Sequence, residues 1–336
     1  MIAIGAVGAG VWGQNHIRTF SSLKDCRLKI CCDKSKQALE KMRTIYGQKL
    51  KLTENFEDIL QDQEIEAVVI AAPAATHAEL AIQALSCGKH VFVEKPLALN
   101  LADGEKMVAA AGKHKRILMV GHLLVYHPAV LRLKDYIKNG ELGEILYLYS
   151  VRVNLGRVRD EENALWSLSA HDISVALFLL EQTPEEVTAK GQSYLRKNIE
   201  DVVFITLKFN HSILAQIHAS WLDPHKMRKF TVVGSKKMAV FDDMQASEKI
   251  RLYDKGIDRK VDYGNYAEYL TLRNGDINIP RIDMREPLQI ECQHFLDCIK
   301  NNLQPTSAGQ QGVETLRVLE AAQLSLNKGG MPVKLI

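Results

Sequence analysis

The stretch Ile2-Ala3-Ile4-Gly5-Ala6-Val7-Gly8-Ala9-Gly10-Val11-Trp12-Gly13 decides the fold of the first part of this chain. Residues 2–7 are apolar or small throughout, which is typical of a strand buried on both faces. Gly8, Gly10 and Gly13 then form a G-x-G-x-x-G pattern that opens a helix. The first glycine permits a tight turn, the second lets the backbone approach a pyrophosphate, and the third lets the helix pack closely on the strand.

Short apolar runs alternate with helical segments on the C-terminal side of this loop. The expected strands are residues 2–7, 28–32, 67–71, 90–93 and 117–120, and the expected helices are residues 14–21, 36–46, 77–86 and 102–114. Such alternation predicts a parallel sheet with helices on both faces. We therefore predict an α/β fold in which residues 1–121 form a Rossmann-type doubly wound domain.

The pattern changes after Gly121, where strands follow one another with few helices between them. The expected strands are residues 145–153, 186–191, 202–209, 213–221, 229–233 and 238–241, with a hairpin turn at residues 210–212. The expected helices are residues 128–138, 172–180, 288–301 and 311–326. Strands in series indicate an antiparallel or mixed sheet. We predict that residues 122–336 form an α+β domain with an open, mostly antiparallel sheet that binds substrate and carries the oligomer interface.

Composition excludes several classes of protein. Lys and Arg number 43 against 40 Asp and Glu, so the formal net charge of +3 argues against a nucleic-acid-binding surface. No apolar run approaches the roughly 18 to 20 residues that span a membrane. The six cysteines show no C-x-x-C pairing and no zinc-like spacing, so we predict no metal site and expect a cytoplasmic protein with reduced thiols.

Asp33 lies twenty residues after Gly13, at the end of the expected second strand. A carboxylate there accepts hydrogen bonds from the adenosine ribose and repels a 2′-phosphate, which favours NAD over NADP. Lys34 follows directly and weakens that preference. The alternative is a surface aspartate that caps a turn.

Glu94-Lys95-Pro96 lies at the carboxyl end of a buried strand, the edge where doubly wound sheets bind ligands. A lysine there can hydrogen-bond a substrate hydroxyl, and desolvation can lower its pKa into a useful range. Without further context, a lysine at this position is more often a solvated charge at a strand end.

The nucleotide loop, Ala72-Pro73-Ala74-Ala75-Thr76-His77 and Glu94-Lys95-Pro96 together resemble the glucose-fructose oxidoreductase/inositol dehydrogenase/MocA family over the whole chain. This resemblance implies that NAD binds in the first domain, that Lys95 is catalytic beside the hydride-transfer site, and that the second sheet assembles a homodimer or homotetramer. The implied cofactor contacts are Gly8, Gly10, Val11, Trp12, Gly13, Asp33, Ala72, Pro73, Thr76, His77, Glu94 and Lys95.

The resemblance also implies a catalytic histidine in the second domain. Many members of the family carry Asp-x-x-x-His-x-x-Asp, and this chain matches the histidine with His171 but has Ser167 in place of the first aspartate. An imidazole pKa near 6.5 suits a general base at neutral pH. The alternative is that His171 only caps the helix that starts beside it.

The segments Gly121–Pro128 and Arg152–Ser167 resemble the branch of the family that oxidises C3 of UDP-N-acetylglucosamine or its uronate. Arg152, Arg157 and Arg159 can clamp a diphosphate, and Trp166 can stack on a sugar or uracil ring. The predicted substrate contacts are Lys95, Arg152, Asn154, Arg157, Asn163, Trp166 and His171. The alternatives are a solvated loop with internal ion pairs, a dehydrogenase of a free polyol, and an NAD-binding regulator without catalysis.

Overall fold

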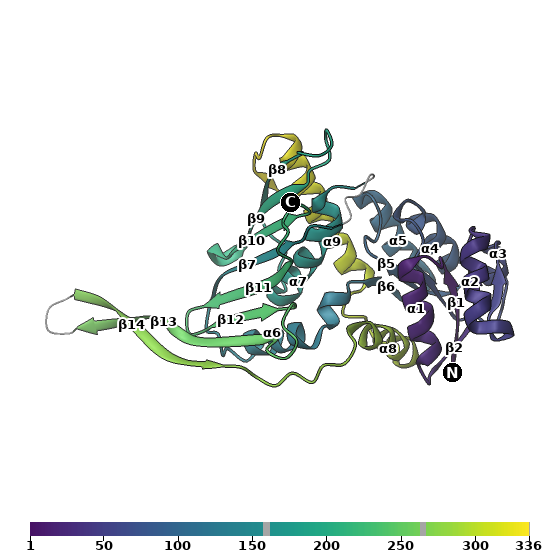
Figure 1. Cartoon of the computed structure of the whole chain (residues 1–336), viewed down its shortest axis with the longest axis horizontal. Helices are drawn as coiled ribbons and strands as arrows, with labels where there is room; N and C mark the ends of the chain where they lie inside the picture. Colours follow the sequence, from purple (N-terminus) through teal and green to yellow (C-terminus); the bar gives the residue numbers. More distant parts are fainter. Residues whose placement is uncertain (157–161, 263–266, 336) are drawn as a thin grey trace. The chain divides into compact units, whose positions relative to one another are not determined.

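The chain forms two compact units in a computed structural model that describes residues 1–156, 162–262 and 267–335 (Figure 1). One unit contains Met1–Tyr126 and Arg285–Arg317, and the other contains His127–Met284 and Val318–Ile336. We expected a single boundary at residue 121. In the structure, residues 285–317 instead belong to the first unit.

The first unit is built on a six-stranded sheet in the order β3-β2-β1-β4-β5-β6, in which all neighbouring strands run parallel. The strands are β1 (Ile2–Val7), β2 (Cys26–Cys32), β3 (Lys51–Thr53), β4 (Ala67–Ile70), β5 (His90–Glu94) and β6 (Leu118–Gly121). The helical elements are α1 (Val11–Ser22), α2 (Lys36–Tyr46), η1 (Gly47–Lys49), α3 (Glu57–Leu60), η2 (Ala74–Thr76), α4 (His77–Ser86), α5 (Leu101–His114), η3 (Leu123–Tyr126) and α8 (Pro287–Asn301). The predicted Rossmann fold is thereby confirmed. The short edge strand β3, helix α3 and the short turns η1, η2 and η3 were not expected.

Helix α8 belongs to this unit because it completes an apolar core. Phe295 packs edge-on against Phe20 of α1 and Phe92 of β5, with ring centroids 6.5 and 5.7 Å apart. Farther along the chain, the Val120 N–H donates to the Ser307 carbonyl at 2.8 Å, which ties the returning segment to β6. The periodicity of the sequence predicts a helix here but does not say which sheet it covers.

The second unit is built on a nine-stranded sheet in the order β14-β13-β12-β11-β7-β10-β9-β8-β15. Its strands are β7 (Ile145–Val153), β8 (Glu186–Gln192), β9 (Val202–Lys208), β10 (Leu214–Ser220), β11 (Met227–Gly234), β12 (Met238–Asp242), β13 (Ile250–Asp262), β14 (Ala267–Asn278) and β15 (Val333–Lys334). β7 and β10 run parallel, and the other neighbours in the described part of this sheet run antiparallel. This confirms the predicted open, mostly antiparallel sheet.

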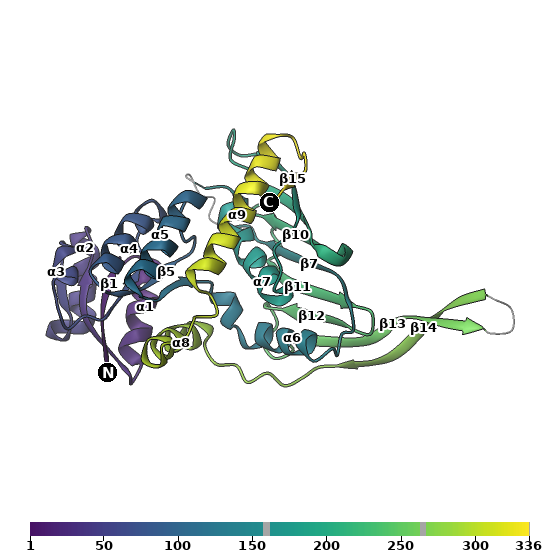
Figure 2. The same cartoon turned by 180° about the vertical axis from the view of Figure 1, so that it is seen from behind.

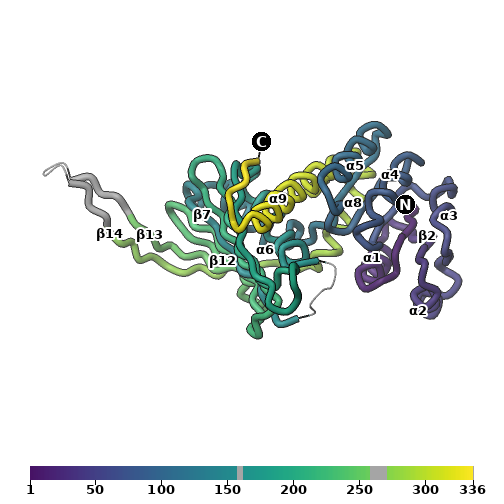
Figure 3. The backbone as a smooth tube through the Cα atoms, turned by 90° about the horizontal axis from the view of Figure 1, so that it is seen from above, coloured from purple at the N-terminus to yellow at the C-terminus, as the bar shows by residue number. Residues whose placement is uncertain are grey.

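Helices lie against one face of this second sheet (Figure 2). They are α6 (Pro128–Lys138), the π-helical turn η4 (Leu165–Ser169), α7 (Ala170–Leu180) and the later part of α9 (Gly309–Asn327); the short turn η5 (Asn210–Ser212) joins β9 to β10. The β13–β14 hairpin was not expected, and Figure 3 shows its two strands running side by side beyond β12.

Candidate active site

Three glycines shape the turn that follows β1. Gly8 has a φ of +95°, and a Cβ atom on it would lie 2.4 Å from the Ala71 carbonyl oxygen. A Cβ atom on Gly13 would lie 2.1 Å from the Gly8 oxygen, whereas a Cβ atom on Gly10 would meet nothing within 4 Å. Packing therefore requires the first and third glycines, while Gly10 faces open space at the start of α1. No side chain caps this helix, so its first N–H groups can bind the pyrophosphate of a dinucleotide.

Asp33 is in direct contact with the same turn. Its Oδ2 accepts a hydrogen bond from the Ala9 N–H at 2.6 Å, and its Oδ1 accepts one from the Ser35 N–H at 2.7 Å. The carboxylate is half-buried at the end of β2, where the sequence places the ribose-binding acid. The glycine turn and Asp33 thus fit the phosphate and ribose groups of NAD.

The turn after β4 is held to the turn after β5 by His77. The ring of His77 is buried, with Nδ1 2.8 Å from the Pro96 oxygen and Nε2 2.9 Å from the Ala72 oxygen. Burial lowers the pKa of His77. Its neutral ring therefore carries one N–H, which can donate to either carbonyl. In this unit the side chain connects two loops of the cofactor edge, and direct contact with NAD stays a prediction.

The other residues of this turn have local contacts. Thr76 donates its hydroxyl hydrogen bond to the Pro73 oxygen at 2.8 Å, which closes the short helix η2. Val11 and Trp12 begin α1 and are exposed beside Gly10, with 79% and 41% of their surfaces accessible. These positions agree with contact to a bound dinucleotide, which stays a prediction for each residue.

Glu94 organises the residues around Lys95. Glu94 ends β5, and its Oε1 lies 2.6 Å from Nε2 of His16 on α1, while its Oε2 accepts the Lys95 N–H at 3.1 Å. Nδ1 of His16 in turn lies 3.8 Å from Sγ of Cys292 on α8. Lys95 itself is half-buried and precedes a cis peptide bond to Pro96. No pattern in the sequence indicates that His16 is a neighbour of this site.

Two further buried groups surround Glu94. Glu291 of α8 is fully buried, and neither of its carboxyl oxygens has a hydrogen-bond partner among the described residues. Burial, followed by the nearby charge of Glu94, raises the pKa of Glu291 well above its usual range. His122, directly after β6, is buried with both ring nitrogens unpaired within the described chain, and burial lowers its pKa to about 4. His122 is therefore neutral at neutral pH, and burial favours the protonated form of the Glu291 carboxyl group.

In the second unit, His171 lies in the first turn of α7, directly after the π-helical turn η4. Its side chain is half-buried, and its carbonyl accepts a hydrogen bond from the Ser174 hydroxyl at 2.8 Å. π-Helical turns are rare and frequently occur at functional sites. Ser167, which stands in place of the family aspartate, lies within this turn and is buried.

Arg152 differs from its predicted role. Its Nε donates to Oδ2 of Asp172 at 2.5 Å and a second guanidinium nitrogen donates to Oδ1 at 3.2 Å, and both side chains are buried. Because its guanidinium group is held by this carboxylate inside the unit, Arg152 is a structural residue in this arrangement rather than an exposed clamp for a diphosphate. Arg157 and Arg159 lie outside the described residues.

Asn163 and Trp166 also have partners inside the second unit. Both donate a hydrogen bond to Oε1 of Gln323 on α9, from Nδ2 of Asn163 at 3.0 Å and from Nε1 of Trp166 at 3.2 Å. Asn163 donates a further bond to Glu200 at 2.5 Å. Asn154 is half-buried after β7, where its N–H donates to the Ser220 carbonyl. These contacts fix the segment before His171, and substrate contact by the three side chains stays a prediction.

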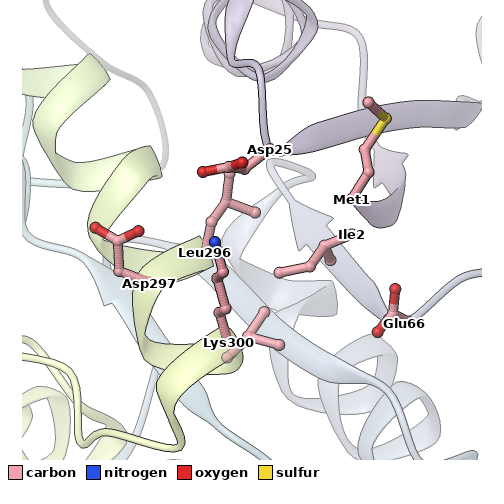
Figure 4. A pocket seen from close by; sticks show the side chains of 8 residues that line it. Met1, Ile2, Asp25, Glu66, Leu296, Asp297 and Lys300 are labelled. Carbon is pink, nitrogen blue, oxygen red and sulfur yellow. The ribbon is translucent and has the colours of Figure 1, made fainter.

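A groove of about 320 Å³ lies elsewhere on the first unit (Figure 4). Met1 and Asp25 line it from the amino ends of β1 and β2, and Lys300 lines it from α8. Dinucleotides bind at the carboxyl ends of the strands in this fold, so the groove is not the cofactor site. Across the described residues, no group of three or more His, Cys, Asp or Glu side chains could hold a metal ion, and no helix is long and apolar enough to cross a membrane.

The parallel sheet, the glycine turn and Asp33 define an NAD-binding oxidoreductase domain. Residues 2–122 match the profile described as "Oxidoreductase family, NAD-binding Rossmann fold", and residues 130–240 match the "GFO/IDH/MocA C-terminal domain". The chain belongs to the Gfo/Idh/MocA oxidoreductase family.

Similar proteins include enzymes with different substrates. A myo-inositol 2-dehydrogenase from Thermotoga maritima is 25% identical, over 97% of this chain and 96% of that protein. The structure of the UDP-N-acetylglucosamine 3-dehydrogenase GnnA from Acidithiobacillus ferrooxidans has a TM-score of 0.81 at 20% identity and covers 98% of each chain. GenD2 from gentamicin A biosynthesis, solved in complex with NAD, has a TM-score of 0.83 at 22% identity and covers 100% of this chain and 96% of its own. The two structures share the fold of this chain.

Proposed function

We propose that this chain is an NAD-dependent dehydrogenase that oxidises a secondary hydroxyl group of a sugar or polyol to a ketone. The observation that carries the proposal is the position of Lys95. It directly follows β5 at the carboxyl edge of the sheet, the edge at which Gly10 faces open space. Ligands of doubly wound sheets bind along this edge, so a lysine here is suited to meet a substrate oxygen beside the nicotinamide ring.

Oxidation of a CH–OH group removes a proton from oxygen and a hydride from carbon, and bound NAD⁺ supplies the acceptor for the hydride. We assign the proton to His171, since a neutral imidazole is a suitable base at neutral pH. The Lys95 ammonium donates a hydrogen bond to the same oxygen and stabilises the negative charge that develops there. Glu94 holds the main chain of Lys95 in place through the bond to its N–H.

The first candidate substrate is UDP-N-acetylglucosamine or its uronate, oxidised at C3. The resemblance of Gly121–Pro128 and Arg152–Ser167 to the nucleotide-sugar branch supports it. We assign the contact with the diphosphate or carboxylate to Arg157, because the Arg152 side chain is already bound to Asp172. Trp166 is half-buried, and it stacks on a sugar or uracil ring through the part of its indole that remains accessible.

The second candidate substrate is a free inositol. One observation favours it. Arg152, one of the three arginines expected to bind a diphosphate, is instead bound to Asp172 in a buried pair. The full-length similarity to a myo-inositol 2-dehydrogenase supports the same reading. An inositol carries no anionic group, so its recognition relies on neutral hydrogen bonds.

A substrate panel separates the two candidates. The purified chain is mixed with NAD⁺ and, in parallel, with UDP-N-acetylglucosamine, its uronate, myo-inositol and scyllo-inositol, and NADH formation is followed by absorbance. Turnover of a UDP-sugar that falls in Arg157→Ala supports the first candidate, and inositol turnover that is unchanged in Arg157→Ala supports the second. NAD binding without turnover of any sugar or polyol would contradict the proposed activity. It would favour the alternative that this chain is an NAD-binding regulator without catalysis.

We also propose that the uncovered face of the second sheet joins copies of this chain into a homodimer or homotetramer. Tyr147 and Tyr149 of β7, Phe204 of β9 and Leu214 of β10 point away from the helices, and between 38% and 47% of each surface is accessible. Leu214 pairs directly with Tyr147 across the two strands, and the rings of Tyr147 and Tyr149 lie 6.4 Å apart, so these three side chains form an apolar patch. Patches of this kind are typical of protein interfaces.

A further inference from the structure

Glu291 lies in a cluster of ionisable side chains that four separate segments bring together inside the first unit. α1 contributes His16, β5 contributes Glu94, the turn after β6 contributes His122, and α8 contributes Glu291 and Cys292. His16, Cys292 and Glu291 are at most 1% exposed, and Glu94 is 9% exposed. The cluster lies directly behind Lys95, because Glu94 binds both His16 and the Lys95 N–H.

The hydrogen bonds within this cluster are unevenly distributed. Glu94 uses both carboxyl oxygens, one toward His16 and one toward the main chain of Lys95. The two oxygens of Glu291 have no such partner among the described residues, although its neighbour Cys292 lies 3.8 Å from His16. An ionised carboxylate without hydrogen bonds in an apolar interior is strongly destabilised, whereas a protonated carboxyl group is far less so.

The charged and ionisable neighbours of Glu291 reinforce this difference. The negative charge of Glu94 disfavours a second negative charge at Glu291, and burial acts in the same direction. His122 is kept neutral by burial, and the pKa of the Cys292 thiol is raised well above its usual range, first by burial and then by Glu291. Two carboxyl groups in one buried site ionise separately, so the one with hydrogen bonds keeps the negative charge.

We propose that Glu291 is a positioning residue that stays a neutral carboxylic acid behind Glu94 and so lets the Glu94 carboxylate keep its bonds to His16 and to the main chain of Lys95. The catalytic part of this inference rests on the proposed dehydrogenase function. Ionisation of Glu291 would place a second negative charge behind Lys95, which would repel Glu94 and draw the Lys95 ammonium away from the substrate oxygen.

Protein stability tests the protonation state without any assay of activity. The ordinary pKa of a glutamate is 4.5, and that of Glu291 is raised in the folded chain. Between these two values the folded protein binds one more proton than the unfolded protein, so stability falls as the pH rises. Glu291→Gln has the shape of the neutral acid but binds no proton. From pH 5 to 8, the folding equilibrium constant of the wild type should therefore fall relative to Glu291→Gln by about tenfold per pH unit, up to the folded pKa.

The matched control is Glu286→Gln, just before the first residue of the same helix, where the exposed side chain pairs with Arg18. This variant should differ from the wild type by the same amount at every pH from 5 to 8. If Glu291→Gln behaves in the same way, then Glu291 is ionised in the folded protein and the inference is wrong. If Glu291→Gln does not fold, infrared spectroscopy of the wild type decides the question: a protonated-carboxyl band at pH 7 that Glu291→Met lacks supports the inference, and its absence contradicts it.

The positioning role is tested by the pH profile of kcat/KM. Glu291→Ala should lose activity at neutral pH, and Glu291→Gln should restore most of it because it retains the shape and neutrality of the acid. Above the pH at which Glu291 ionises, the wild type should lose activity that Glu291→Gln keeps. Identical alkaline limbs in these two proteins would overturn the positioning role. If no sugar or polyol is oxidised, the proposed function fails while the stability experiment still reports on Glu291.

Discussion

Arg152 of β7 and Asp172 of α7 form a two-point ion pair, with Nε to Oδ2 at 2.5 Å and a second bond at 3.2 Å, inside the second unit. The pair joins the sheet to the helix whose first turn carries His171. A planar guanidinium group that meets both oxygens of one carboxylate fixes orientation as well as charge. The ion pair therefore holds the first turn of α7 against the sheet. It thereby fixes the position of His171, which directly precedes Asp172.

Removing one partner of this pair should destabilise the second unit strongly. Arg152→Leu leaves the Asp172 carboxylate buried without its cation, and such changes cost about 3–5 kcal/mol. Unfolding in urea, followed by circular dichroism, measures the loss. The double variant Arg152→Leu/Asp172→Leu should recover most of the stability, because neither member of the buried pair is then left without its partner. Full stability of Arg152→Leu alone would show that the pair contributes little.

The glycine turn separates packing from binding in two matched variants. Gly13→Ala should lower stability by about 1–3 kcal/mol, because its methyl group would overlap the Gly8 oxygen. Gly10→Ala should leave stability nearly unchanged, because its methyl group meets open space, yet it should weaken NAD binding measured by calorimetry. Tight NAD binding by Gly10→Ala would show that the pyrophosphate does not approach this residue.

The choice between NAD and NADP should depend on Asp33. Asp33→Asn loses the charged acceptor for the ribose hydroxyls, so its affinity for NAD should fall by about 10- to 100-fold, in line with about 1.5–3 kcal/mol for a hydrogen bond to a charged group. Its affinity for NADP should rise, since the charge that repels a 2′-phosphate is removed. Lys34→Ala should change the preference in the opposite direction. Calorimetric titration with both cofactors measures each change.

The catalytic assignments are tested by substitution of Lys95 and His171. Each alanine variant should reduce kcat/KM by about 10²–10⁴-fold, the range for loss of one acid–base group. If both groups act in one chemical step, the double variant should lose much less than the product of the two single losses. Lys113→Ala and His211→Asn are the controls, since both residues are exposed and lie outside the proposed site. Unchanged rates in Lys95→Ala and His171→Ala would contradict the assignment.

The proposed assembly through the second sheet can be tested by light scattering. Tyr149→Glu and Leu214→Glu each place a charge on the apolar patch, so both should shift the mass toward that of one chain. Leu131→Glu is the matched control, because Leu131 is 36% exposed on α6, a helix on the other face of the sheet. A wild-type protein that has the mass of one chain would contradict the proposed interface.

The sequence predicts some elements closely and others not at all, for identifiable reasons. The bounds of α6 and β7 agree with the expected ranges, since proline and apolar alternation mark them clearly. The β13–β14 hairpin was missed because the alternation of buried and exposed residues in β13 ends after Ile250 and Leu252. The part of the hairpin beyond these residues therefore shows little of the apolar pattern that predicts a strand.

Within the site, residues fixed by short-range patterns were identified, whereas long-range partners were not. Gly8, Gly13 and Asp33 follow from local spacing. Glu291 carries a signal that can be seen in retrospect, because it lies three residues after Leu288 on the apolar face of an amphipathic helix, where a charged residue is unusual. The pairing of Arg152 depends on a carboxylate twenty residues away, which three closely spaced arginines do not reveal.

The return of residues 285–317 to the cofactor-binding unit affects how the chain can fold during synthesis. When only Met1–Tyr126 has emerged from the ribosome, Phe20 and Phe92 are present without Phe295. The apolar core beneath α1 is therefore still incomplete. The second unit likewise awaits Val318 and the residues after it. Because domains generally fold as units, both cores close late in translation, and the nascent chain exposes apolar surface that chaperones can bind until then.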